Sequence, residues 1–506
     1  MAENNAISHI VIVGGGSAGW MAASGLSKML GPAYSIRLIE SEEIGIVGVG
    51  ESTVPHLSFF NKLLEIDEAD FIRATQGTFK LGIQFNDWGR IGDSYMHGFG
   101  TVIGLDLGML PFHQYWLKAR QSGRAEDLGA YSLNTLAAPR GKFMTSAIDA
   151  PPNTPLANIA HSYQFDAGLY AAHLRRYAEK RGVRRTEGKV QRTNLRASDG
   201  FVESIVMENG EVIAGDLFVD CSGFRGLLIE QALNTGYEDW SHWLPCNRAV
   251  VVPCASVAPP TPYTRVTARP AGWQWRIPTQ HRVGNGYVYS SNYLSDDEAA
   301  VDLLANIDGR ALSDPRVLRF TSGRRKKAWN KNVVSLGLAS GFIEPLESTS
   351  IYLVQSGIAR LGTMLPRDDF SEVVTDRYNA QTAFEWERIR DFLILHYNAT
   401  ERDDTPFWDY CRTMDIPESL RSVVELFRDS GRYFRNADEM FGLVSWVQVM
   451  IGQRVVPRSY HPFVDQLGEK ELQSYMDHVR QVIAGCVDAM PMHQAFIDRH
   501  CKAPAA

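Results

Sequence analysis

A short β-branched run that ends in glycines, near the start of the chain, is the feature that most constrains the fold. His9 to Val13 reads HIVIV, a continuous apolar run typical of a strand buried on both faces. It stops at GGGSAG, where Gly14, Gly16 and Gly19 match the spacing GxGxxG, and apolar residues then recur at helical spacing. The sequence therefore predicts a buried strand, a tight turn and a helix, in that order.

The glycine turn has the pattern of a dinucleotide-binding site. A pyrophosphate binds against backbone N–H groups at a helix N-terminus, where a Cβ would keep it away. Ser35 to Glu40 reads SIRLIE, a second strand, and Glu40 lies 21 positions after Gly19, about where an acid accepts hydrogen bonds from an adenosine ribose. The alternative is a glycine turn that only connects two core elements. The residues predicted to bind the dinucleotide are Gly14, Gly16, Ser17, Ala18, Gly19 and Glu40.

Composition limits the classes of protein to which this turn can belong. At about 150 residues per domain, a chain of 506 residues is expected to form two or three domains. Its formal net charge of −7 argues against a surface for nucleic acid or anionic lipid. The six cysteines form no CxxC pair, which fits neither a disulfide framework nor a zinc ribbon. Without a leader pattern or an apolar run of about 18 residues, the sequence predicts a cytoplasmic protein.

Two later apolar runs favour FAD over NAD as the dinucleotide. Asp216 to Asp220 reads DLFVD and Val333 to Gly341 reads VVSLGLASG, and both resemble the later strands of glutathione-reductase-like flavoproteins. A turn at Glu208 to Glu211 separates two alternating runs, which predicts a hairpin of Phe201 to Met207 with Val212 to Phe218. No second GxGxxG follows a strand, so we expect that the flavin is reduced elsewhere and delivered, or is reduced without a dedicated NADPH domain. Neither HExxH nor another ligand spacing indicates a metal.

Four further stretches make the prediction more specific. Gly48 to Pro55 reads GVGESTVP, Lys80 lies in GTFKLGIQF, Trp273 to Pro278 reads WQWRIP, and Gly341 to Tyr352 reads GFIEPLESTSIY. Together they resemble the flavin-dependent tryptophan halogenase family, in the family's motif order. The resemblance implies an α/β fold, in which a Rossmann-type, glutathione-reductase-like FAD-binding domain with mixed sheets carries a C-terminal helical substrate subdomain. It also implies FAD, used as FADH2, with Gly50 and Leu338 beside the cofactor.

Lys80 lies in a segment that alternates like a strand. Phe79, Leu81, Ile83 and Phe85 point one way in such a strand, and Lys80 points the other way. The pattern alone predicts a solvated lysine, because ammonium groups usually stay in water. The resemblance implies a catalytic lysine instead. This lysine is expected to meet hypohalous acid formed at the flavin. It would either hydrogen-bond the acid or become a haloamine, and so deliver the halogen to the substrate.

A helix is predicted to begin near Ser348, since the apolar residues that follow recur at helical spacing. Capping and the helix dipole explain serine, threonine and acids at such a start without any catalytic role. The resemblance implies that Glu347 is catalytic, lies beside Lys80 and accepts the proton of the halogenated arenium ion. It also implies that Thr349 and Ser350 bind halide through backbone N–H groups. Ser350 replaces the glycine that is common in tryptophan-specific members.

Aromatic residues supply the remaining predicted site residues. Trp273 and Trp275 face the same side of a strand, and core packing alone would explain them. The resemblance implies instead that this pair shields the flavin from the substrate. It also places His97 and Phe99, from YMHGFG, in the substrate pocket. Trp446 is a further candidate for the pocket wall, with a helix core as the alternative.

The segment from 430 to 470 bears on the substrate. Tryptophan-specific members have a tyrosine pair followed by an acid and an aromatic residue, which grip the amino-acid group, and we find no such pattern here. Instead the chain reads SWVQVMIGQRVVPRSYHP from Ser445 to Pro462. The sequence therefore favours an indole-like or larger aromatic substrate over free tryptophan.

These inferences combine into one functional hypothesis, an enzyme that adds chloride or bromide to an electron-rich, indole-like aromatic using FADH2 and dioxygen. The FAD-binding domain is predicted at 1–367 and a helical subdomain over the substrate site at 368–506, with helices at Ala380 to Tyr397 and Lys470 to Val487. The proline-rich residues 258–262 predict a loop between strands. The expected partners are a small aromatic substrate and a separate flavin reductase, without nucleic acid or membrane, and a homodimer is left open. The alternatives are a flavin-dependent aromatic hydroxylase and a flavin carrier or sensor.

Overall fold

The structure is a computed structural model of the chain, and it describes residues 6–44, 50–146, 150 and 154–504. Its contacts divide the chain into two compact units, each built from three separate segments. The first unit comprises Met1–Gly77, Phe165–His242 and Arg319–Glu387, and the second comprises Thr78–Gln164, Trp243–Leu318 and Arg388–Ala506. The functional division between residues 367 and 368 stays a prediction.

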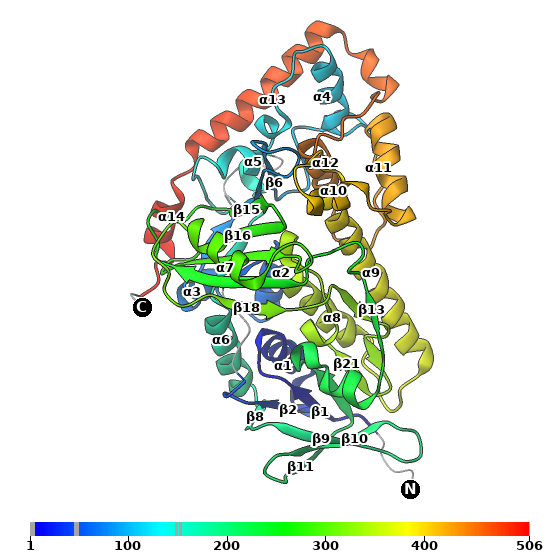
Figure 1. Cartoon of the computed structure of the whole chain (residues 1–506). Helices are drawn as coiled ribbons and strands as arrows, with labels where there is room; N and C mark the ends of the chain where they lie inside the picture. The colour runs from blue at the N-terminus through cyan, green and yellow to red at the C-terminus, as the bar shows by residue number, and fades with distance from the viewer. Residues whose placement is uncertain (1–5, 45–49, 147–149, 151–153, 505–506) are drawn as a thin grey trace. The chain divides into compact units, whose positions relative to one another are not determined.

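A six-stranded sheet forms the centre of the first unit (Figure 1). In sheet order its strands are β20 (Trp329–Asn330), β21 (Val333–Ser335), β12 (Leu217–Asp220), β1 (His9–Val13), β2 (Ser35–Glu40) and β8 (Arg184–Glu187). The strands from β21 to β8 run parallel, whereas β20 is an antiparallel edge. A parallel pair needs a crossover, and helix α1 (Ser17–Leu30) supplies it between β1 and β2. The predicted strand, turn and helix are therefore confirmed.

Helices and two small sheets complete the first unit. Helix α1 packs against α6 (Ala167–Lys180) and α8 (Ser350–Thr363). The predicted hairpin is confirmed, with a second arm that ends early, at Ala214, because Leu217 already begins a strand of the central sheet. The other elements are α2 (His56–Leu63), α3 (Glu68–Ala74), β3 (Glu51–Ser52), the sheet of β9 (Val190–Leu195), β10 (Val202–Met207) and β11 (Val212–Ala214), and the sheet of β13 (Tyr237–Asp239), β19 (Gly323–Arg325) and β22 (Gly341–Phe342).

A seven-stranded sheet forms the centre of the second unit. In sheet order its strands are β18 (Arg316–Arg319), β14 (Arg248–Cys254), β17 (Val283–Tyr289), β16 (Gly272–Pro278), β15 (Thr264–Arg269), β5 (Gly82–Asn86) and β6 (Ser94–Gly98). The short strand β4 (Thr78–Lys80) pairs instead with β7 (Ser162–Phe165). The proline-rich residues 258–262 connect β14 to β15, as predicted.

Helices make up most of the rest of the second unit (Figure 1). The long helices predicted near the end of the chain are present as α9 (Glu372–Asn398), which has residues in both units, and α13 (Glu469–Ala489). The remaining helices are α4 (Phe112–Gln121), α5 (Leu133–Ala137), α7 (Asp296–Ala305), α10 (Pro406–Thr413), α11 (Glu418–Ser430), α12 (Leu443–Gly452) and α14 (His493–His500).

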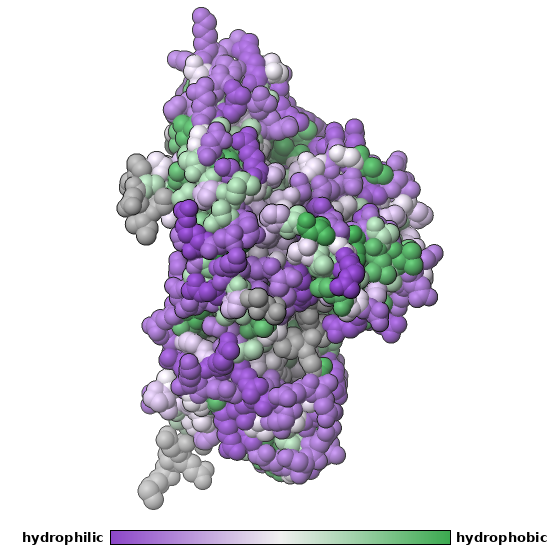
Figure 2. Space-filling view, turned by 90° about the vertical axis from the view of Figure 1, so that its left-hand side faces the viewer, coloured by the Kyte–Doolittle hydropathy of each residue, from purple (hydrophilic) through white to green (hydrophobic). Residues whose placement is uncertain are grey.

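The surface and the cysteines agree with the composition. The face in Figure 2 is mainly hydrophilic, with hydrophobic residues in smaller groups. Among the described residues, no helix is long and apolar enough to cross a bilayer. All six cysteines are free thiols in the structure.

Candidate active site

The glycine turn between β1 and α1 uses its glycines for different reasons. Gly14 has a φ of +115°, and a Cβ there would collide with the carbonyl of Cys221. A Cβ on Gly19 would collide with the carbonyl of Gly14. Both glycines are therefore required by the fold itself. Gly16 differs, because a Cβ there would have no atom within 4 Å beyond its own residue and the two adjacent ones.

The open space at Gly16 fits the pyrophosphate of a dinucleotide. Helix α1 begins at the next residue, Ser17, and its first turn carries no acidic side chain. The first N–H groups of a helix have no intrahelical acceptor, and they point to the positive end of the helix dipole. The turn therefore offers donors and room to an anion. The predicted Gly14, Gly16, Ser17, Ala18 and Gly19 form this one continuous turn.

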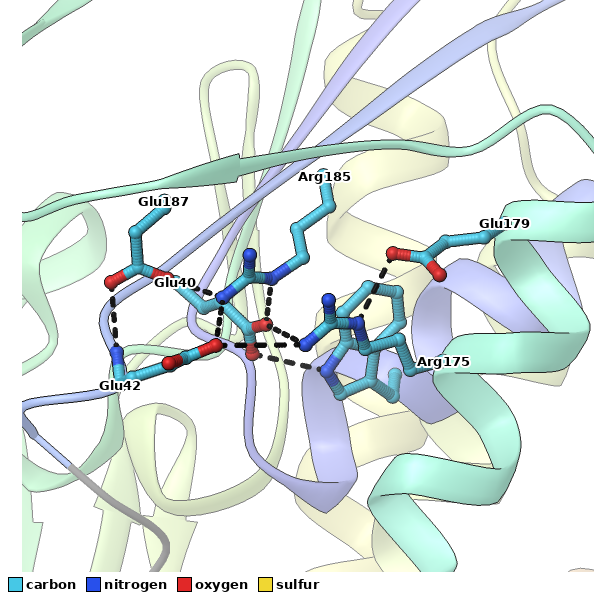
Figure 3. A network of polar contacts seen from close by, with 7 residues as sticks. Glu40, Glu42, Arg175, Glu179, Arg185 and Glu187 are labelled. Atoms are coloured by element: carbon cyan, nitrogen blue, oxygen red, sulfur yellow. Dashed lines mark hydrogen bonds and ion pairs between the residues drawn. The ribbon is translucent and has the colours of Figure 1, made fainter.

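Glu40 ends β2 with its carboxylate against the same turn, where a Cβ on Gly15 would collide with it. One carboxylate oxygen accepts a 3.1 Å hydrogen bond from the indole N–H of Trp20. The other oxygen pairs with Arg185 of β8 and lies 3.5 Å from a guanidinium nitrogen of Arg175 on α6. Figure 3 shows these groups converging on Glu40. They orient the carboxylate, which suits its predicted role as the ribose acceptor.

The two arginines beside Glu40 are shared with other carboxylates (Figure 3). Arg185 also pairs with Glu187 and, at 2.9 Å, with Glu42. Arg175 also pairs with Glu179 at 3.1 Å. The network therefore holds more carboxylates than guanidinium groups. This surplus of negative charge would repel a phosphate on the ribose. It therefore favours a ribose with free hydroxyl groups, which is the ribose that FAD carries.

The other predicted cofactor residues also lie in the first unit. Leu338 belongs to a 3-10 turn, Gly337–Ala339, which lies against the start of α1, because a Cβ on Gly337 would come within 2.8 Å of the Ala18 side chain. Gly50 has a φ of +131°, a conformation that favours glycine. Gly48 and Val49 of the same predicted motif lie outside the described residues.

The predicted base and halide residues lie at the N-terminus of α8. Glu347 ends the 3-10 turn Pro345–Glu347 and is completely buried. Ser348 then adopts a left-handed φ of +59°, which turns the chain into α8. Ser350 is the first residue of that helix. The left-handed backbone conformation, which favours glycine, is thus at residue 348. Residue 350 is helical, so a serine can stand there in place of the glycine that is common in tryptophan-specific members.

Thr349 adds an observation that favours an anion at this helix start. Its side chain is completely buried, and within the described part of the chain its hydroxyl has no hydrogen-bond partner. Thr349 is the N-cap residue of α8, yet its side chain does not cap the helix. A buried hydroxyl donor beside the first N–H groups of a helix is suited to hold a halide ion.

Lys80 is completely buried, which contradicts the solvated lysine that its alternating pattern predicts. The pattern treats residues 79–85 as one strand, but β4 ends at Lys80 and β5 begins at Gly82 in another sheet. Between them, the Leu81 N–H donates a 2.8 Å hydrogen bond to the carbonyl of Pro262. Because every residue of β4 is buried, Lys80 has no solvated face to occupy.

The ammonium group of Lys80 meets an aromatic ring within the second unit. Its Nζ lies 5.1 Å from the ring centroid of Phe99, within cation–π range. Phe99 is held by its own N–H, which donates to the Leu81 carbonyl, and by Asn134, whose amide donates to the Phe99 carbonyl at 2.7 Å. Lys80 and Phe99 are thus brought together. Glu347 belongs to the other unit, and its contact with Lys80 stays a prediction.

His97 and Trp446 contact the same buried aromatic ring in the second unit. The ring centroid of Phe392 lies 5.8 Å from that of His97 and 5.0 Å from that of Trp446. Phe441 stacks on Phe392 at 4.0 Å. The rings of His97, Phe392, Phe441 and Trp446 are here called the aromatic cluster. Both interpretations of Trp446, pocket wall and helix core, are compatible with its burial on α12.

A tyrosine and an acid that the sequence patterns did not predict lie beside this cluster. Tyr433 stacks on Trp446 at 5.3 Å, and its hydroxyl donates a hydrogen bond to Glu439. Glu439 is buried, and its other oxygen accepts a 2.7 Å hydrogen bond from Asn436. Burial, and then the bond to Glu439, raise the pKa of Tyr433 above its usual range. Their signal in the sequence is a single tyrosine followed by an acid and Phe441, and not the tyrosine pair of tryptophan-specific members.

The tryptophan pair lies on one face of β16, as predicted. The ring centroids of Trp273 and Trp275 are 5.9 Å apart, and both side chains are buried. The indole of Trp275 covers Gly286 on β17, where a Cβ would collide with it. Among the described residues, the indole N–H of Trp275 has no hydrogen-bond partner. The shielding of a flavin by this pair stays a prediction.

A parallel sheet whose first strand enters a glycine turn, with an acid at the end of the second strand, defines a Rossmann-type dinucleotide-binding protein. Within the described residues, no cluster of His, Cys, Asp and Glu is arranged to hold a metal ion. The chain belongs to the tryptophan halogenase family, whose model matches residues 9–469. The predicted family and α/β flavoprotein fold are thereby confirmed.

Named relatives agree with this assignment. The tryptophan 6-halogenase SttH of Streptomyces toxytricini is 35% identical over 440 residues, which is 83% of each chain. The structure of Xcc4156, a flavin-dependent halogenase from Xanthomonas campestris, matches with a TM-score of 0.96 and 49% identity over 99% of this chain and 100% of that one. BrvH, a flavin-dependent halogenase from Brevundimonas sp. BAL3, matches with a TM-score of 0.94 and 43% identity over the same shares. The protein is an enzyme of the flavin-dependent halogenase class.

Proposed function

We propose that this enzyme uses FADH2, dioxygen and chloride or bromide to halogenate an electron-rich, indole-like aromatic substrate. The observation that carries the proposal is the complete burial of Lys80. A lysine is rarely fully buried unless its charge is paired, and burial readily shifts the pKa of its amine, which suits a catalytic lysine. When bound, reduced FAD supplies hypohalous acid from dioxygen and halide. The residues that would hold it are Gly14, Gly16, Ser17, Ala18, Gly19, Glu40, Gly50 and Leu338.

Lys80 and Glu347 carry out the halogen transfer in this proposal. The Nζ of Lys80 either hydrogen-bonds the hypohalous acid or forms a haloamine with release of water, and so presents an electrophilic halogen to the ring. The carboxylate of Glu347 accepts the proton that the ring releases. The burial of both side chains supports the proposal, because it excludes water as a competing nucleophile.

The halide is proposed to bind at the start of α8. The backbone N–H groups of Thr349 and Ser350 lie where a helix has no acceptor of its own. The buried hydroxyl of Thr349, which has no partner in the described part of the chain, supports this position as a further donor. Trp273 and Trp275 would then keep the aromatic substrate away from the flavin.

The substrate is proposed to lie near Phe99 and the aromatic cluster. Stacked and edge contacts with these rings suit an indole. The relative SttH is named a tryptophan 6-halogenase, but both oxygens of Glu439 already accept hydrogen bonds from protein groups, Tyr433 and Asn436. An ammonium group would compete with those bonds. This favours an indole without the amino-acid group, or a larger aromatic molecule.

A separate flavin reductase is proposed to supply FADH2. The sequence has one GxGxxG turn behind a strand, which the cofactor itself would occupy, and no second turn of this type for a nicotinamide nucleotide. The reducing nucleotide would therefore bind to another protein.

The deciding assay combines the enzyme with FADH2, dioxygen, bromide and indole, and compares the wild type with Lys80→Ala and Lys80→Met. Brominated indole made by the wild type and lost in both variants, with FAD binding retained, is the expected result. Hydroxylated indole made by all three proteins would instead establish an aromatic hydroxylase. No product from a broad aromatic panel would leave a flavin carrier as the function.

A further inference from the structure

Both neighbours of Lys80 are tied to one loop of the second unit. The N–H of Leu81 donates directly to the Pro262 carbonyl at 2.8 Å. The N–H of Phe79 donates to Nε2 of His493 at 3.2 Å, and Nδ1 of that histidine lies 2.8 Å from the Pro260 carbonyl. The histidine thus bridges Phe79 to the loop that also holds Leu81.

The two contacts define the protonation state of His493. Nε2 accepts a hydrogen bond from Phe79, so the ring proton must be on Nδ1, where it is donated to Pro260. A doubly protonated ring would have no acceptor left for the Phe79 N–H. His493 is 1% exposed, and burial lowers its pKa to about 4. The neutral ring is therefore the form that can hold β4.

Aromatic packing and backbone hydrogen bonds fix the ring in place. Phe79 stacks on Phe143 at 4.3 Å, and the His493 ring lies edge-on to Phe143 at 5.5 Å. Phe496, one turn further along α14, packs edge-on against both phenylalanines, at 5.5 and 5.1 Å. The N–H of His493 donates to the Gly141 carbonyl at 2.8 Å. The C-terminal helix α14 is thus fastened to β4 through a cluster of side chains that cannot shift singly.

We propose that His493 is a positioning residue for Lys80, which it fixes by holding the Phe79 backbone and the Pro260 carbonyl in one bridge. The inference rests on the proposed function, in which Lys80 delivers the halogen. Phe79 is directly before Lys80, so a shift of β4 at Phe79 displaces the Lys80 side chain. A misplacement of about 1 Å can cost roughly a hundredfold in a reaction that depends on positioning.

The test compares three substitutions of His493 with one matched control, all in the full-length enzyme loaded with FAD. His493→Phe keeps a ring but loses both hydrogen bonds, and His493→Asn keeps a donor for Pro260 but is too short to accept from Phe79. His493→Gln can place an amide oxygen where Nε2 was. His113→Phe is the control, since His113 is also buried in the second unit and bonds to the Gly431 carbonyl at 2.7 Å rather than to β4.

Two readouts are measured at a temperature where every variant is folded. The first is hydrogen exchange at the Phe79 amide, by mass spectrometry of a peptide spanning 78–81. The second is brominated indole formed per FADH2 consumed. His493→Phe and His493→Asn should raise the exchange and lower the product yield about tenfold, with FADH2 consumption unchanged. His493→Gln should keep both near wild type, and so should His113→Phe.

The inference is overturned by a wild-type product yield in His493→Phe or His493→Asn, and equally by a loss of yield in His113→Phe that is as large as theirs. An unchanged Phe79 exchange rate in both variants would also reject the bridge, whatever the yield. The Lys80→Ala enzyme separates this failure from failure of the proposed function. If it brominates indole like the wild type, the role of Lys80 is wrong, whereas the exchange at Phe79 still reports on the bridge.

Discussion

Gln448 binds both backbone groups of Gly98, a residue 350 positions away in the chain. Its amide oxygen accepts a 3.0 Å hydrogen bond from the Gly98 N–H, and its amide nitrogen donates to the Gly98 carbonyl at 3.0 Å. One side chain thus takes the place of a neighbouring strand at the end of β6. Because Gln448 lies on α12 with Trp446, this pair of bonds fixes Trp446 relative to His97, and with it the aromatic cluster.

Replacing Gln448 with leucine should therefore loosen the proposed substrate site. Gln448→Leu leaves the N–H and carbonyl of Gly98 without these partners, at a cost of about 2 kcal/mol in the free energy of unfolding. We expect the KM for indole to rise several-fold, while FAD binding stays at the wild-type level. Gln453→Leu is the control, because Gln453 is buried at the end of the same helix and bonds to the His396 carbonyl. An equal rise in KM in both variants would count against a local effect.

Gly16→Ala should remove cofactor binding without harming the fold. The φ of Gly16 is −73°, which alanine adopts readily, and beyond the two adjacent residues the added methyl group would meet no protein atom within 4 Å. The methyl would instead occupy the space proposed for the pyrophosphate. We expect the Kd for FAD to rise at least about a hundredfold, which is about 3 kcal/mol, with the melting temperature of the FAD-free protein unchanged. FAD fluorescence titration and thermal melting measure these two quantities. Tight FAD binding by Gly16→Ala would show that the cofactor lies elsewhere.

Trp275→Phe should be tolerated better than Trp273→Phe. The indole N–H of Trp275 is buried without a partner among the described residues, and burial of such a donor costs about 1–3 kcal/mol. Removing this N–H should offset the packing lost with the smaller ring. We therefore expect the free energy of unfolding of Trp275→Phe to lie within about 1 kcal/mol of the wild-type value. Trp273→Phe does not remove a donor of this kind. We therefore expect it to lower the free energy of unfolding by about 2 kcal/mol. Urea unfolding of the two variants measures the difference. A larger loss in Trp275→Phe would mean that its N–H is satisfied in solution.

The sequence predicted those parts of the site whose geometry is local. The glycine turn and Glu40 follow from short strands, one helix and a fixed spacing, so the structure places them as expected. The burial of Lys80 could not be predicted from periodicity, because the chain changes sheet at Leu81 and the alternation runs through that point unchanged. The bridge from Phe79 to His493 joins residues 414 positions apart, and no local pattern encodes it.

The stability of the enzyme should fall as the pH falls below about 6.5, in part because of two buried histidines. Burial lowers the pKa of His113 and of His493 to about 4, against an ordinary value of 6.5. Between these pH values the unfolded chain binds protons that the folded chain does not, so each histidine makes unfolding easier as the solution is acidified. Each histidine lowers the free energy of unfolding by about 2 kcal/mol as the pH falls from 7.5 to 5. Glu51 acts in the opposite sense, because burial, and then the charge of Asp166, raise its pKa to about 7.

Comparing variants isolates the histidine contribution from that of Glu51. The loss of unfolding free energy between pH 7.5 and 5 should be smaller in His113→Gln than in wild type by about 2 kcal/mol, because glutamine takes up no proton. Urea titrations at the two pH values measure it, and Glu51, present in both proteins, cancels. If His113→Gln loses as much stability as the wild type, His113 must already be protonated in the folded state. In that case its ring would not be desolvated, and the packing of α4 around it would have to be looser than the structure describes.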